Sequence, residues 1–62
     1  MRYRIKLTLV LVTPRKAVLT LNKYFRASTV EIAHARQNAY IRAMTADGSK
    51  IRTQVSVGYW VG

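Results

Sequence analysis

Residues 2–27, RYRIKLTLVLVTPRKAVLTLNKYFRA, decide the fold, because apolar and polar side chains alternate on both sides of the single proline, Pro14. A period of two is typical of a β-strand with one buried face. The odd positions on the two sides of the proline turn are apolar with the exception of Lys23. They are Tyr3, Ile5, Leu7, Leu9, Leu11, Ala17, Leu19, Leu21, Phe25 and Ala27. The stretch therefore predicts a β-hairpin whose odd-numbered residues build the core.

The length of the hairpin loop stays open. Opposed residues of an antiparallel pair share a face, so the loop must hold an odd number of residues to set odd against odd. A three-residue loop, 13–15, places Leu9 opposite Leu19 and Arg4 opposite Tyr24. A five-residue loop keeps the same faces with a shifted register.

The same stretch argues against an export signal or a membrane segment. The apolar run after Lys6 ends at Pro14 and is far shorter than the roughly 20 residues that span a bilayer. No small-residue cleavage site follows it. We therefore expect no membrane association and a cytoplasmic location.

A helix is predicted from residue 28 onward. Ser28 is the expected N-cap, and Glu31 completes a capping box three residues later. One isoleucine and several alanines recur at helical spacing and are expected to lie against the sheet. They are Ile32, Ala35, Ala39 and Ala43.

The end of this helix is less well defined. In the interpretation that we favour, the helix runs to Ala46 and Gly48 caps it. In the other, residues 39–46 form a strand of a second hairpin that turns at Asp47-Gly48.

The last segment, residues 50–61, alternates again and predicts a strand. We expect one set of its side chains to face the core, namely Ile51, Val55, Val57, Tyr59 and Val61. Gly58 is a candidate β-bulge. The chain thus predicts a single small basic α+β domain, 1–62, with an antiparallel sheet of three to four strands (order ββαβ or ββαββ) and one helix packed on one face.

The composition argues against an enzyme. The 62 residues include no cysteine, one histidine (His34) and two carboxylates (Glu31 and Asp47), which leaves no set of groups for acid–base or metal chemistry. We therefore expect no catalytic site, no cofactor and no metal. Eleven Lys and Arg residues give a net charge of +9, which attracts nucleic acid or an acidic protein surface.

The sheet face away from the helix is the candidate binding surface. Its expected basic, amide and aromatic side chains are Arg2, Arg4, Lys6, Lys16, Asn22, Tyr24, Arg26, Lys50, Arg52, Gln54 and Trp60. Basic groups neutralise phosphates, flat rings stack on unpaired bases, and a sheet can enter the major groove. DNA or RNA binding is the leading prediction. Two alternatives stay open, a homodimer that buries this face and a face that is merely solvated.

The stretch YFRASTVEIAHA, residues 24–35, runs from a strand into a Ser-capped helix after a basic hairpin. In this layout it resembles the arm-type DNA-binding domains of phage and transposon integrases, which put a three-stranded sheet into the major groove. It also resembles small phage-encoded proteins that inhibit a host enzyme or defence complex. The second resemblance implies a non-enzymatic inhibitor or adaptor that binds an acidic surface of a host protein in the host cytoplasm.

Overall fold

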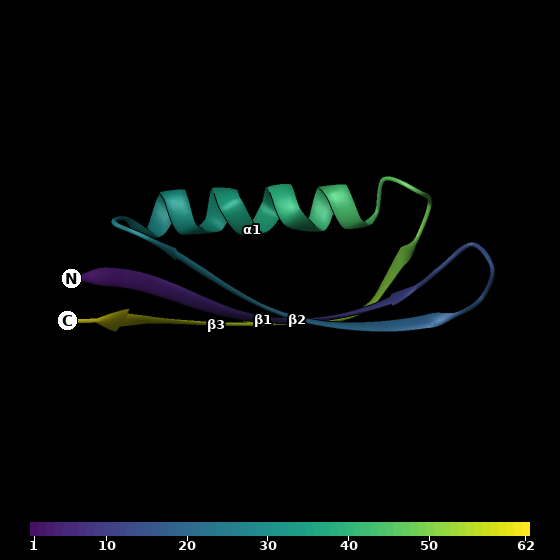
Figure 1. Cartoon of the computed structure of the whole chain (residues 1–62), viewed down its shortest axis with the longest axis horizontal. Helices are drawn as coiled ribbons and strands as arrows, with labels where there is room; N and C mark the ends of the chain where they lie inside the picture. The colour runs from purple at the N-terminus through teal and green to yellow at the C-terminus, as the bar shows by residue number, and fades with distance from the viewer.

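Three strands and one helix follow one another in the order ββαβ in the computed structural model, which describes residues 1–62 (Figure 1). The elements are β1 (Arg2–Val12), β2 (Val18–Ala27), α1 (Val30–Met44) and β3 (Lys50–Val61). The strands form one antiparallel sheet in the order β2-β1-β3, and α1 lies along one face of it. The interpretation with a long helix is therefore confirmed, and residues 39–46 form no additional strand.

The β1–β2 hairpin has the five-residue loop, so the register drawn with three loop residues is wrong. Leu9 pairs with Leu21, and Arg4 pairs with Arg26. Inside the loop the Lys16 N–H donates to the Thr13 carbonyl at 2.8 Å, and Lys16 takes a left-handed φ of 65°. The Thr13 N–H also donates to the Ala17 carbonyl at 2.8 Å, so the turn closes at Thr13 and Ala17 and brings Val12 opposite Val18.

The core lies between β1 and α1. The odd-numbered side chains of β1 are fully buried because this strand is central in the sheet and lies under the helix; they are Ile5, Leu7, Leu9 and Leu11. Lys23, the exception in the alternation, does point to this side. Its ammonium lies 5.7 Å from the centre of the Tyr40 ring, a cation–π contact that leaves the charge in water.

The helix starts one residue later than expected. Thr29, not Ser28, is the N-cap, and its hydroxyl oxygen accepts a hydrogen bond from the Ile32 N–H at 3.2 Å. Gly48 does follow the helix with a left-handed φ of 91°, in the turn that leads to β3. The helix ends at Met44 with Thr45 as its C-cap, so its end lies two residues before the predicted one and Gly48 is not the cap.

The predicted buried face of the helix is wrong. The residues expected against the sheet are all exposed: Ile32, Ala35, Ala39 and Ala43. The sheet instead contacts a neighbouring set, in which Ala33 and Gln37 are buried and Tyr40, Ile41 and Met44 are partly buried. The physical reason is area, because the large side chains of this second set remove more apolar surface from water than alanines can.

The side-chain directions predicted for most of β3 are also wrong. The β1–β3 register shifts by one residue at Val10/Leu11, where Thr53 and Ile51 are the successive partners and Arg52 is the extra residue of a β-bulge. A one-residue shift exchanges the two faces of a strand. Ile51 therefore faces the helix side as expected, but beyond the bulge the row that faces away from the helix is Thr53, Val55, Val57, Tyr59 and Val61.

Candidate nucleic-acid interface

One face of the sheet carries no covering element, because α1 lies on the other side (Figure 1). We call it the open face. Cross-strand pairing places Arg4 at its centre line, between Arg26 of β2 and Tyr59 of β3. The next row sets Lys6 between Tyr24 and Val57.

Basic side chains gather at the end of the open face where the two chain termini lie (Figure 1). We call this group the basic cluster, and it consists of Arg2, Arg4, Lys6 and Arg26. Two exposed rings flank it, since 59% of Tyr24 and 39% of Tyr59 is accessible to solvent. Each ring thus has a cation of the cluster as its neighbour on the adjacent strand, a combination that also occurs on surfaces that hold unpaired nucleic acid.

No carboxylate side chain balances the basic cluster, because none of the three strands contains Asp or Glu. Glu31 lies in the first turn of α1, and Asp47 lies in the turn that follows α1. The hydroxyl and the backbone N–H of Ser49 bind the Asp47 carboxylate and lower its pKa below the ordinary 3.8. That negative charge is held in the turn. Arg4 and Arg26 are directly opposed like charges, an arrangement that is unfavourable until an anion joins it.

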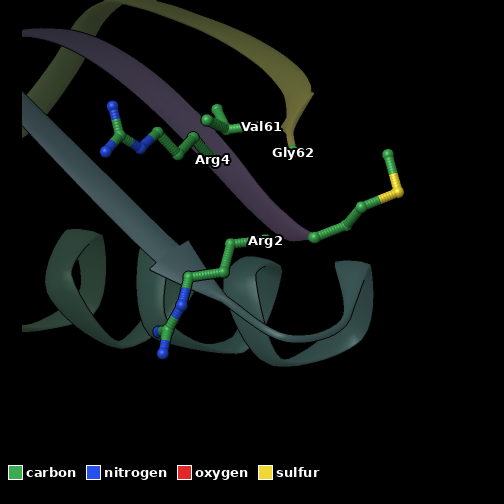
Figure 2. A pocket seen from close by; sticks show the side chains of 5 residues that line it. Arg2, Arg4, Val61 and Gly62 are labelled. Atoms are coloured by element: carbon green, nitrogen blue, oxygen red, sulfur yellow. The ribbon is translucent and has the colours of Figure 1, made fainter.

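Arg4 lines two shallow hollows at this end of the molecule. One, of about 240 Å³, is lined by Arg4, Tyr24, Phe25 and Arg26. The other, of about 310 Å³, is lined by Met1, Arg2, Arg4, Val61 and Gly62 (Figure 2). Figure 2 shows the Arg2 and Arg4 side chains leaving β1 in different directions. An anion could therefore meet guanidinium groups from either side of the strand.

The other residues predicted for this surface lie in three different places. Asn22 lies on the open face, where its Oδ1 accepts a hydrogen bond from the Thr8 hydroxyl at 3.0 Å. Lys16 and Lys50 lie at the opposite end of the sheet, in the hairpin loop and beside Val12. Arg52 is the extra residue of the bulge. These three cations are not part of the basic cluster.

Gln54 and Trp60 lie on the helix side of the sheet, so their assignment to the open face is wrong. Trp60 pairs with Tyr3 across the strands, and the two rings meet edge to face with centroids 5.1 Å apart. Tyr59 takes the place on the open face that sequence reasoning gave to Trp60. The cause is the bulge at Arg52, which puts every later residue on the face opposite to the one that strict alternation predicts, and the local sequence carries no signal of it.

No group of three or more His, Cys, Asp and Glu side chains is arranged to hold a metal ion. The helix lacks the length and apolar character that crossing a membrane requires. No protein-family model, curated protein or solved structure matches the chain.

Proposed function

We propose that the protein is a non-enzymatic module that binds nucleic acid on its open face, mainly through phosphate contacts. The observation that supports this most is the basic cluster on a sheet without any acidic residue. Binding there places phosphates against the opposed guanidinium groups of Arg4 and Arg26 and so removes their mutual repulsion.

The exposed rings favour an unpaired strand over a duplex. Tyr24 lies beside Lys6, and Tyr59 lies beside Arg4, so each ring has a cation as its cross-strand neighbour. An unpaired base can stack on such a ring while its phosphate contacts the neighbouring cation, whereas the bases of a duplex are already stacked on one another. Arg2, Arg4, Lys6 and Arg26 are the phosphate partners in this proposal, and Tyr24 and Tyr59 are the stacking partners.

Fluorescence anisotropy with labelled single-stranded DNA, single-stranded RNA and duplex DNA tests the proposal across a series of salt concentrations. We expect affinity for single strands to fall linearly on a plot of log K against log salt concentration. Arg4→Gln should weaken binding and reduce the steepness of that line by about 0.7, the value for one phosphate contact on a single strand. Tyr24→Ala should weaken binding with little change in the slope, because stacking releases no counterions.

Arg42→Gln is the matched control, since it removes the same charge from an exposed position in the last turn of α1. It should leave affinity close to that of the unchanged protein. The proposal fails if no single strand binds at low salt. It also fails if Arg42→Gln costs as much affinity as Arg4→Gln, because binding would then follow net charge alone.

A second candidate function is an inhibitor or adaptor of an acidic host protein, as one of the two sequence resemblances implies. It is favoured by the apolar row beside the basic cluster, in which Val55, Val57, Tyr59 and Val61 are exposed. Protein interfaces combine apolar and aromatic side chains with Arg in this way. A pull-down from a nuclease-treated bacterial lysate separates the two candidates. A protein partner that survives nuclease treatment favours the inhibitor, and loss of every partner favours nucleic-acid binding.

A further inference from the structure

Strand β3 forms one edge of the sheet, and it is exposed along its whole length. The helix packs on β1 and β2 and reaches β3 through a single side-chain hydrogen bond, in which the Ser56 hydroxyl donates to Gln37 Oε1 at 2.8 Å. The outer side of β3 therefore offers a row of unpaired backbone N–H and C=O groups.

The outer side of β3 also lacks the usual protection of an edge strand. Natural sheets shield their edges with charged side chains, proline or a covering element. Residues 53–61, TQVSVGYWV, contain no charge and no proline, and their side chains on the open face are four β-branched residues and one tyrosine. The opposite edge, β2, carries Lys23 and Arg26. The two edges differ, and only β3 is suited to pairing with another strand.

The charge distribution of β3 favours a second copy of this chain in antiparallel orientation. Its two cations, Lys50 and Arg52, both lie at its first end. Antiparallel pairing about a two-fold axis sends these residues to opposite ends of the contact, so like charges do not meet. Stacking two open faces would instead bring two basic clusters together, at a cost in repulsion.

The side chains of β3 are also self-complementary in this arrangement. A two-fold axis perpendicular to the sheet keeps both open faces on the same side and sets odd residues opposite odd residues. The uncharged stretch is centred on Val57, which then opposes its own copy, while Val55 opposes Tyr59. Pairs of β-branched and aromatic side chains are among the favourable cross-strand pairs.

The solvent-exposed area of the chain also favours association of two copies. The chain exposes 4477 Å², whereas a folded monomer of its 7.1 kDa mass exposes roughly 4,100 Å². Eight of the 62 residues are buried, none of them in β3. A domain this small commonly needs association or another reinforcement to be stable.

We propose that two copies pair through their β3 strands, antiparallel and centred near Val57, and so join two three-stranded sheets into one continuous sheet. The helices of both copies lie on one side of this sheet, and both open faces lie on the other. The inference concerns the β3 edge and does not depend on what the basic cluster binds.

Sedimentation velocity of the nuclease-treated protein over a concentration series, at a salt concentration that screens its charge, tests this pairing. We expect the mass to rise with concentration from 7.1 kDa toward twice that value. Val57→Lys and Val57→Glu each place like charges across the two-fold axis and should raise the dissociation constant about tenfold or more. An equimolar mixture of the two variants should dimerise again, because opposite charges then meet.

Thr20→Lys is the control, because it adds the same charge on the same face of the other edge strand, β2. It should dimerise like the unchanged protein, and circular dichroism melts should show all variants folded. The proposal is overturned if the unchanged protein keeps a mass of 7.1 kDa at every concentration. It is equally overturned if the Val57→Lys variant dimerises with the same dissociation constant as the Thr20→Lys variant.

Discussion

At the scale of single residues, the contact of Gly58 with Tyr3 fixes how β3 lies against β1. A Cβ atom at position 58 would lie 1.7 Å from the Tyr3 hydroxyl oxygen and 2.5 Å from the ring carbon that bears it. Only glycine leaves room for this ring, which crosses from β1 and meets Trp60 edge to face. An aromatic ring over a glycine on the neighbouring strand shields the backbone that the glycine exposes.

We predict that Gly58→Ala lowers the free energy of unfolding by about 1–3 kcal/mol, the usual cost of overpacking. In a Tyr3→Leu background the same substitution should cost much less, because the ring that it displaces is gone. Urea unfolding of the four proteins in this double-mutant cycle gives both values. Gly62→Ala is the control and should have no effect, since nothing lies within 4 Å of its added Cβ. Equal costs of Gly58→Ala in both backgrounds would contradict the proposed role of the ring.

At the scale of the elements, the direction of the side chains in a strand is predictable from the sequence only where neighbouring elements bury one face of that strand. Strand β1 is covered by the helix and paired on both sides, so burial requires a strict alternation from Ile5 to Leu11, and this pattern is visible in the sequence. Most of the basic cluster follows from it, because Arg2, Arg4 and Lys6 occupy the alternate positions of the same strand.

Strand β3 has no such constraint. Neither of its faces is buried, so its apolar row from Val55 to Val61 does not reveal which side the helix covers. The direction is set by the extra residue Arg52, and nothing in the local sequence marks that residue as a bulge. Gly58, which the sequence suggested for that role, serves to admit a ring instead. This is why alternation alone places Trp60 instead of Tyr59 on the open face.

The shifted start of α1 leads to a direct comparison of two adjacent hydroxyl residues. Thr29→Ala should destabilise the protein by about 1 kcal/mol, because it removes the acceptor for the Ile32 N–H. Ser28→Ala, at the position that the capping-box pattern predicts, should be nearly neutral. Thermal unfolding followed at 222 nm compares the two. A larger loss for Ser28→Ala would mean that the helix starts at the earlier residue.

At the scale of the whole molecule, a small hydrophobic core stabilises a chain that carries a large positive charge. The protein measures 42 × 16 × 11 Å, and its core draws mainly on the inward side chains of β1. A net charge of +9 on such a thin body produces self-repulsion that opposes folding. The strongest local contribution is expected where Arg4 and Arg26 are directly opposed.

We therefore predict that the melting temperature rises by several degrees between low salt and about 0.5 M NaCl, because the added ions screen this repulsion. Arg26→Gln should raise the melting temperature at low salt and reduce its dependence on salt. Arg42→Gln removes a charge that is favourable at the end of a helix, so it should bring no such gain. Differential scanning calorimetry measures all three proteins. A melting temperature that does not change with salt would contradict this account.

The bulge in β3 also has an evolutionary consequence. Deleting the single residue Arg52 would restore an unbroken ladder, in which Ile51 still opposes Leu11 and Thr53 still opposes Val10, so every later residue would keep its partner on β1 and its face. A loss of one codon at this position would thus leave the row from Val55 to Val61 outward and the row from Gln54 to Trp60 inward. A related chain that lacks the residue at position 52 is therefore expected to present the same row of β3 residues on the open face.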